Sequence, residues 1–391
     1  MRNAIHTQFF YLILVLSGIQ LTTSAQSRLA DAVEFSTSVT GDFIINFKGG
    51  VKQGFTYIGK EDITFTLNTE AAGMWKNGTF FIHGLNTHGI GPSEQFTHDF
   101  QVLSNIEAGD HTGLFEFWYT HQIGKFSILV GQHDLNTEFL GSKYSAILVN
   151  SSFGIMPSIS LNMPISIFPL AAPGVVLKYE ADNNLIYRFG IYDGNPGSFE
   201  DNRYNLNVKL NSLEGFFNIG EIQYNQMDGD REVGNYKIGG YYHSGVFPNY
   251  NDTTQTIKGN YGVYALADRA LFARSLHAGR GLCIFFQGGL ADPNRNMVHY
   301  YLGGGFRYHG ILPDRYKDQL GLGIAHISLS QDYLMNYSNG RTYETAIETT
   351  YIFHFGKRYF IQPSMQYIIN PGADKSISNC LVGLLRFSIT N

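Results

Sequence analysis

The stretch that decides the fold runs from Tyr343 to Phe355 and reads YETAIETTYIFHF. Its odd-numbered positions are aromatic, aliphatic or threonine, whereas its even-numbered positions include Glu344, Glu348 and His354. Successive side chains of a β-strand point to opposite faces. The alternation therefore predicts a long strand that has one apolar face and one polar face.

The same alternation recurs along most of the chain, in residues 63–68, 204–211, 300–309, 359–369 and 381–390. Several of these segments reach the roughly 9–11 residues of a tilted transmembrane strand, which is longer than the roughly 5–6 of an average soluble strand. Tyrosine and phenylalanine stand near the ends of several apolar faces, as in the aromatic girdles of membrane barrels. Charged residues lie mainly on the polar faces.

Composition narrows the class of protein further. Of 391 residues, 15% are charged and 15% aromatic, 44 are glycine, and the net charge is −5. The aromatic content excludes a disordered chain, and no run of about 18 apolar residues follows the N-terminus, which excludes a helical membrane bundle. A sequence pI of about 6.2 argues against nucleic-acid binding by bulk charge.

Three regions are expected along the chain. Residues 1–25 read as a secretory signal peptide, because the apolar core from Phe9 to Leu16 is followed by Thr23-Ser24-Ala25, a small-residue cleavage site near Ala25. Residues 26–41 form a short N-terminal segment, and residues 42–391 form one barrel domain. Only Cys283 and Cys380 are present, so the fold is not a disulfide scaffold; whether the two pair is left open.

Two all-β architectures fit this alternation. In a soluble sandwich the apolar faces meet in a core, whereas in an outer-membrane barrel they face lipid and the polar faces line a lumen. Strand length, aromatic placement and charge placement favour a transmembrane antiparallel β-barrel with a water-filled lumen. Sixteen strands of about ten residues fit the length, although a 22-strand barrel also fits.

Short blocks along the chain resemble the OprB-type carbohydrate-selective porins. The order and spacing of these blocks hold from about Gly54 to Arg386. The blocks are Gly59-Lys60-Glu61-Asp62-Ile63, Glu116-Phe117-Trp118-Tyr119, Gly131-Gln132-His133-Asp134-Leu135-Asn136, Pro173-Gly174, Ile191-Tyr192-Asp193-Gly194-Asn195-Pro196, and Asn370-Pro371-Gly372 ahead of Gly383-Leu384-Leu385-Arg386-Phe387.

The resemblance implies a 16-stranded barrel in the outer membrane of a Gram-negative bacterium, through which small sugars diffuse passively. Its partners would be sugars in transit, outer-membrane lipid and the barrel-insertion machinery; monomer and trimer both stay open. One departure stands out. Family members commonly finish on an aromatic residue, whereas this chain ends Ser388-Ile389-Thr390-Asn391, which makes recognition by the insertion machinery less assured.

The longest stretch without alternation runs from Leu140 to Pro173 and contains Ser152 and Phe153. A loop of that length in a compact domain is usually functional. We expect part of it to fold into the barrel and narrow the lumen, with Ser152 and Phe153 at the constriction. The alternative is an outer loop that lies over the rim.

Strand parity predicts which other side chains enter the lumen. Trp118 shares a face with Glu116, opposite Phe115, Phe117 and Tyr119. Its indole could stack on a sugar ring while Glu116 accepts hydroxyl hydrogen bonds, or it could pack against the inserted loop. The inward charges expected by the same rule are Lys209, Arg307, Glu344, Glu348 and Arg386. Their mixed signs favour neutral solutes, and simple solvation or cross-strand pairing is the alternative.

Motifs for catalysis, cofactors or metals are not found. The chain lacks G-x-S-x-G, H-E-x-x-H, a phosphate-cradling G-x-x-x-x-G-K, and C-x-x-C. Glu344 and Glu348 would lie about 13 Å apart on a strand, too far for the roughly 5–9.5 Å of a glycosidase pair. The expected function is a channel and not an enzyme. A general diffusion pore, another outer-membrane barrel such as an adhesin, and a secreted sandwich that binds or cleaves polysaccharide are the rivals.

Overall fold

The computed structural model describes residues 31–207, 214–271, 281–337 and 339–391. The expected signal peptide and its cleavage site lie outside these residues. None of the helices within the described residues combines the length and the apolar character that a membrane-spanning helix needs.

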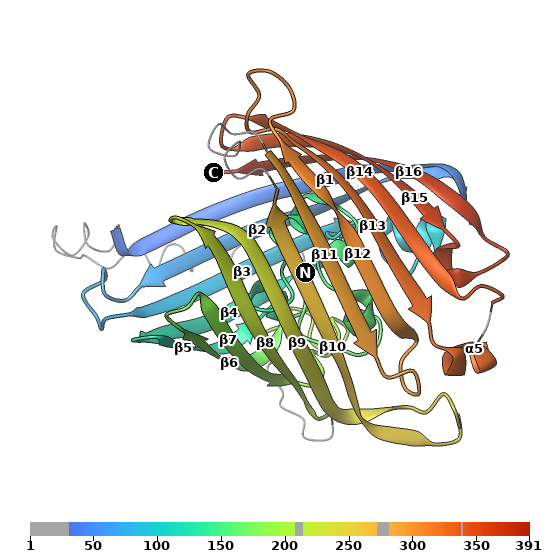
Figure 1. Cartoon of the computed structure of the whole chain (residues 1–391), viewed down its shortest axis with the longest axis horizontal. Coiled ribbons are helices and arrows are strands. Elements are labelled where there is room, and N and C mark those ends of the chain that lie inside the picture. The colour runs from blue at the N-terminus through green and yellow to red at the C-terminus, as the bar shows by residue number, and fades with distance from the viewer. Residues whose placement is uncertain (1–30, 208–213, 272–280, 338) are drawn as a thin grey trace, which may run out of the picture.

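Sixteen antiparallel strands within the described residues close into a barrel, each paired with its sequence neighbours, and β1 pairs with β16 (Figure 1). The strands are β1 Val33–Gly50, β2 Gly54–Asn68, β3 Gly78–Gly89, β4 His111–Ile123, β5 Phe126–His133, β6 Ala172–Glu180, β7 Leu185–Asp193, β8 Phe216–Asp228, β9 Arg231–Pro248, β10 Thr256–Ala270, β11 Gly281–Ala291, β12 Val298–His309, β13 Gln319–Leu329, β14 Tyr343–Phe355, β15 Tyr359–Ile369 and β16 Ser378–Thr390.

The strand expected at residues 343–355 is β14, with the same bounds. Those expected at 63–68, 300–309, 359–369 and 381–390 lie within β2, β12, β15 and β16. The strand expected at 204–211 is wrong over residues 204–207, which belong to a loop, and its remainder lies outside the described residues. The barrel also begins earlier than expected, because β1 starts at Val33 and not at Asp42.

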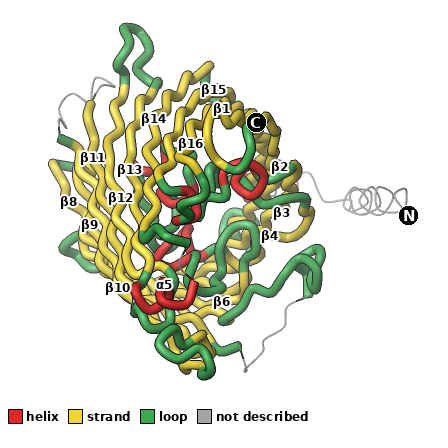
Figure 2. The backbone as a smooth tube through the Cα atoms, turned by 90° about the vertical axis from the view of Figure 1, so that its right-hand side faces the viewer, coloured by secondary structure: helices red, strands yellow, loops and turns green. Residues whose placement is uncertain are grey.

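Two long connections occupy the interior of the barrel. Inner loop 1, residues 90–110, joins β3 to β4, and inner loop 2, residues 134–171, joins β5 to β6. Inner loop 1 contains η1 (Ser93–Thr97), and inner loop 2 contains η2 (Leu135–Thr137), η3 (Ser145–Ile147), η4 (Ser151–Phe153) and α3 (Pro157–Ser160). Figure 2 shows short helices and loops inside the ring of strands. The expectation that part of residues 140–173 enters the barrel agrees with this arrangement.

Both inner loops connect their strands at the same end of the barrel, which we call the loop end. The opposite end carries tight turns such as residues 124–125 between β4 and β5, and 229–230 between β8 and β9, and we call it the turn end. Two further short helices, α5 (Gln331–Tyr337) and η5 (Pro371–Ala373), lie in loop-end connections.

Buried carboxylates on the barrel wall fix the inner loops. Glu348 accepts hydrogen bonds from the backbone N–H groups of Val149 and Asn150, at 2.8 and 2.9 Å. The other members of this set, the carboxylate anchors, each accept at least one inner-loop N–H: Glu116 from Asp134, Glu221 from Leu140, Asp268 from Lys143, and Glu344 from Phe100 and Gln101. All five carboxylates are nearly inaccessible to solvent.

Apolar packing completes the contact between inner loop 2 and the wall. Phe153 packs edge-on against Phe285 of β11, with ring centroids 5.9 Å apart. Leu140, Val149 and Ile159 are fully buried in the same cluster as wall residues of β1, β2 and β5 to β16. Inner loop 2 and the wall are therefore packed together where these residues meet, and cavities remain elsewhere in the lumen.

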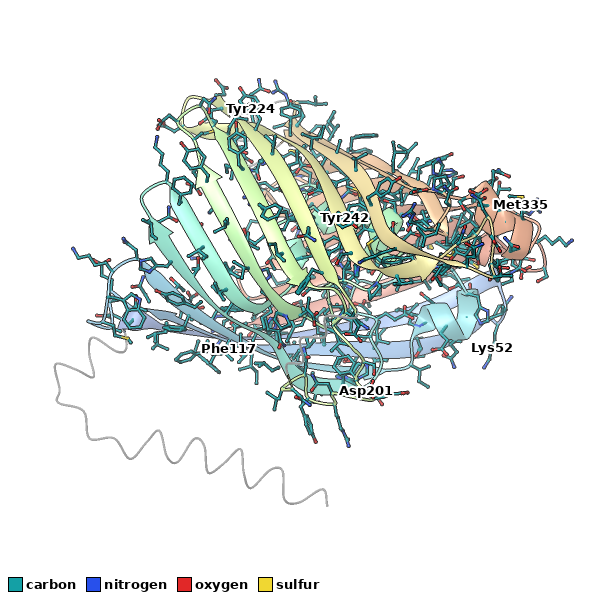
Figure 3. All side chains as sticks on the ribbon, turned by 90° about the horizontal axis from the view of Figure 1, so that it is seen from below. Lys52, Phe117, Asp201, Tyr224, Tyr242 and Met335 are labelled. Carbon is teal, nitrogen blue, oxygen red and sulfur yellow. The ribbon has the colours of Figure 1, made fainter. Side chains whose placement is uncertain are left out.

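The outer face of the barrel is apolar and aromatic. Phe117, Tyr224 and Tyr242 are 49, 44 and 46% exposed, and Figure 3 shows them on the exterior of the wall. Along β14, Tyr343 and Ile347 point outward while Glu344 and Glu348 are buried, as the alternation predicted. Cys283 and Cys380 are both buried and free, so they do not pair.

Replacing Glu348 with Gln should loosen inner loop 2. A glutamine offers one acceptor oxygen where two N–H donors need one each, and a buried donor left unpaired costs about 1–3 kcal/mol. We expect faster hydrogen exchange at Val149 and Asn150, with the barrel retained. The matched control is Glu200→Gln, which alters an exposed carboxylate in the β7–β8 connection; equal exchange in the two variants would contradict the anchoring role.

Candidate functional site

A row of polar side chains crosses the inner wall on β2, β3 and β4. Lys60 contacts Asp62 at 2.9 Å, and Nε2 of His83 lies 2.9 Å from the Asp62 carboxylate. Nδ1 of His83 lies 3.2 Å from Oε2 of Glu116, which also accepts the Asp134 N–H at 3.1 Å through Oε1. We call Lys60, Asp62, His83 and Glu116 the charged row. Along the row, the ammonium group of Lys60 and the imidazole of His83 alternate with the carboxylates of Asp62 and Glu116.

A β-bulge sets the geometry of this row. The register between β3 and β4 pairs His83 with Glu116 but Gly84 with Leu114, so Phe115 is the extra residue. A bulge turns its extra residue away from the regular alternation. Phe115 is accordingly 6% exposed and packs edge-on against His83, with ring centroids 5.2 Å apart. The prediction that Phe115 shares the outer face with Phe117 is therefore wrong.

Trp118 faces the interior, as parity predicted. Its ring stacks on Phe81 at a centroid distance of 4.7 Å, and it also packs against the buried core. Its partner residue in β5 is Gly131, which has φ +143°; a Cβ at that position would lie 2.6 Å from Cα of Trp118. Glycine is therefore needed for β5 to approach β4 at this point.

Trp118 lines a cavity of about 440 Å³ at the turn end of the barrel. Thr120, Gln122 and Lys178 line the same cavity, together with Glu138 of inner loop 2. Glu138 pairs with Arg188 of β7 at 3.5 Å. The cavity thus combines one large aromatic face with hydroxyl, amide and charged groups of both signs, which suits a neutral, hydroxyl-rich solute.

A second cavity, of about 280 Å³, lies at the loop end between the two inner loops. Two carboxyl groups of the loops line it. Burial raises the pKa of Asp134 to about 7. Burial, together with the neighbouring Asp99, raises the pKa of Glu107 to about 8, even though Ser93 donates to both oxygens of Glu107.

Arg307 lines a third and larger cavity, of about 960 Å³, near the turn end. Its guanidinium lies over the ring of Tyr144 at 4.8 Å and donates to the carbonyl of Lys143 at 3.1 Å. Asp228 and Glu232 share the cavity, so both signs of charge are present. Arg307 points inward as predicted, but it contacts inner loop 2 rather than the charged row.

The remaining predicted residues do not face open lumen. Glu344 and Glu348 are fully buried beneath the inner loops, whereas Ser152 and Phe153 belong to inner loop 2 itself and are 1% exposed; Ser152 also lines the 280 Å³ cavity. Arg386 is 8% exposed and makes a two-pronged contact with Asp42, with both distances 2.8 Å. The inward orientation that strand parity predicts is found for the strand residues Glu344, Glu348 and Arg386. Lys209 lies outside the described residues.

Sequence reasoning missed Lys60, His83 and Arg188. Lys60 and Asp62 stand at alternate positions of β2, so the parity rule applied to the whole strand would have placed both inward. His83 stands on β3, where the same parity rule would have placed it inward. Arg188 is brought to the site by its pairing with Glu138, which strand parity does not reveal.

Comparison with known proteins places this geometry among porins. The chain is 26% identical over 255 residues to Porin B of Pseudomonas aeruginosa, and 21% identical over 253 residues to the putative porin QuiX of Acinetobacter baylyi. Each alignment covers 58% of this chain and 55% of the relative. The chain thus spans about half the length of the curated relatives that it matches.

Solved structures share the fold. The high-pH structure of Pseudomonas putida OprB matches with a TM-score of 0.85 at 19% identity, over 94% of this chain and 96% of that one. The channel DcaP of Acinetobacter baumannii matches with a TM-score of 0.57 at 11% identity, over 92 and 97%. The family model for the carbohydrate-selective porins, OprB family, matches residues 52–390. The chain belongs to the OprB family of carbohydrate-selective porins.

Proposed function

We propose that this protein is a passive channel for small neutral sugars. The observation that carries the proposal is the position of Trp118 on an open cavity, directly beside the charged row. In the proposed path a solute enters the 280 Å³ cavity, passes Asp134 and Glu116, and leaves through the 440 Å³ cavity. Inner loop 2 narrows this path because it lies inside the barrel and contributes Asp134 and Glu138 to the two cavities.

The chemistry of the path favours sugars over ions. An aromatic ring can stack on the apolar face of a pyranose, and neighbouring carboxylates and amides can exchange hydrogen bonds with its hydroxyls. The charged row contains both signs close together, so neither simple anions nor simple cations gain a uniform attraction. Trp118 is the residue that we assign to sugar contact, and we assign to Glu116, which is buried between His83 and the Asp134 N–H, the role of holding inner loop 2 beside it.

The family places the barrel in the outer membrane of a Gram-negative bacterium. Barrels of this kind have short periplasmic turns and longer outer loops. We infer that the loop end faces the cell exterior, so that sugars meet the inner loops first. We also propose that the protein acts only as a channel, since the charged row lies in a solute path and none of its members is a nucleophile placed beside a base.

Liposome swelling tests the proposal directly. Vesicles carrying the purified protein are diluted into glucose or into an amino acid of similar size. We expect faster swelling in glucose, because the amino acid carries two charges that must be desolvated in the narrow path. Equal swelling rates in the two solutes would instead indicate a general diffusion pore.

Replacing Trp118 with Leu should weaken sugar binding in the channel. Loss of one aromatic stacking contact is worth about 0.5–1.5 kcal/mol, which corresponds to roughly two- to tenfold in affinity. The measurement is the glucose concentration that half-maximally reduces ion current through single channels in a planar bilayer.

The matched control for Trp118 is Trp75→Leu. Trp75 lies in the β2–β3 turn, is 43% exposed and donates a hydrogen bond to Tyr119 OH, so it does not line the path. We expect wild-type sugar affinity in the Trp75 variant. A comparable loss in both variants would show that stacking in the path is not the cause.

The docking of inner loop 1 should depend on pH. A carboxyl group normally titrates near pH 4.3, whereas the pKa of Glu107 is raised to about 8 in the folded protein. The folded state therefore binds the proton more tightly, and stability falls as pH rises from about 4 to 8.

Hydrogen exchange of residues 90–110, corrected for the intrinsic pH effect, measures this dependence. We expect less protection at pH 9 than at pH 6 in the wild type, and a smaller difference in Glu107→Gln, which carries no titrating group at that position. An unchanged difference in the variant would exclude Glu107 as the cause.

A further inference from the structure

The 280 Å³ cavity between the two inner loops contains a polar side chain without a partner. Gln101 lines this cavity and is 2% exposed. Neither the oxygen nor the nitrogen of its side-chain amide has a hydrogen-bond partner among the described residues. Buried amides are nearly always paired in folded proteins, so this one stands out as a group available to a ligand.

The backbone at Gln101 is held firmly although its side chain is not. The N–H groups of Phe100 and Gln101 both donate to Glu344, and the carbonyl of Leu103 accepts from Gln366 of β15. Inner loop 1 therefore fixes the position of Gln101 beside the cavity. The side chain of Gln101 extends from this fixed backbone among the residues that line the cavity.

Several other polar groups around the cavity already have partners. The side-chain nitrogen of Asn136 donates to two carbonyls of inner loop 2, and the side-chain oxygen of Asn105 accepts from Arg386. Glu107 accepts from Ser93. Gln101 is thus the side chain whose donor and acceptor are both unused, and this pair matches adjacent hydroxyl groups of a sugar.

The apolar lining complements that amide. Phe100 and Phe168 bring aromatic rings to the cavity, and Ile155 and Leu161 add aliphatic surface. Small-molecule sites commonly combine a mostly apolar wall with a few polar groups that fix orientation. A pyranose ring, which has an apolar face and a rim of hydroxyls, suits such a wall.

Charge and volume restrict the ligand further. Glu107 and Asp134 line the cavity, whereas no lysine or arginine among the described residues does. An anionic sugar would therefore find no cation to pair with in this cavity. A cavity of about 280 Å³ lies just below the roughly 300–1,000 Å³ of sites for drug-sized ligands. That volume fits one sugar ring better than two.

The geometry points to an outer binding site for a single neutral pyranose, formed by the two inner loops and oriented by Gln101. This inference rests on the proposed sugar channel and adds a second point of contact to it. Asp134 lines the cavity and donates its N–H to Glu116, so a sugar released from the outer site is next to the charged row. The outer site raises the local sugar concentration ahead of Trp118.

The test compares Gln101→Met with Gln95→Met in the full-length protein in planar bilayers. Gln95 lies in the same inner loop and also has a buried, unpartnered amide oxygen, but it does not line the cavity. Glucose is added to the loop-end side only, and the rate of sugar-induced current interruptions is counted. We expect this rate to fall about fivefold or more in Gln101→Met and to stay at the wild-type value in Gln95→Met.

Thermal stability provides a second readout. Removing an amide without partners should leave the unfolding temperature unchanged or raise it, so the loss of sugar response would not come from misfolding. If both Gln101→Met and Gln101→Leu unfolded at lower temperature, the amide would have a structural partner and the inference would be overturned. Glucuronate, which keeps the pyranose ring and adds a negative charge, should interrupt the current far less often than glucose; equal rates would overturn the assignment to a neutral ring.

The result also separates this inference from the proposed function. If wild-type channels respond to glucose but Gln101→Met responds equally, the outer site is excluded and the sugar channel stands. If wild-type channels show no response and no swelling in glucose, both proposals are excluded.

Discussion

Hydrogen bonds from backbone N–H groups to buried carboxylates determine the interior of this barrel. A carboxylate removed from water without partners is very costly, and so is a loop whose N–H groups are buried unpaired. The carboxylate anchors on β4, β8, β10 and β14 satisfy both requirements at once. Inner loop 2 can therefore stay inside the barrel, and its position decides which part of the lumen is open.

This arrangement makes the lumen asymmetric. Inner loop 2 and the wall form a packed core that includes Phe153 and Phe285, while a cavity beside Arg307 remains near the turn end. Close to β4, Trp118 lines a second cavity, and Glu116 of the charged row accepts the N–H of Asp134, which lines a third. Selectivity in a pore depends on its diameter and its lining groups. Both are set here by the residues that line the cavities, so a small number of residues controls what the channel can admit.

Alternation was sufficient to predict the barrel because it reports the face on which each side chain lies. The bounds of β14 and the inward positions of Glu116 and Trp118 followed from it directly. It could not predict what lies against that face. Glu348 was expected to meet water, yet it meets Val149, a residue 199 positions away. Phe115 was misplaced for a related reason, since a bulge depends on the register between two strands.

The long separation between Glu348 and Val149 has a consequence for assembly. Inner loop 2 belongs to the first half of the chain, but two of its N–H groups find their acceptor only on β14. Contacts between distant segments form late, because the chain must close a large loop before it gains them. The interior is therefore completed after the carboxyl-terminal strands arrive. A nascent barrel that lacks them would hold a loosely attached segment inside an unfinished cylinder.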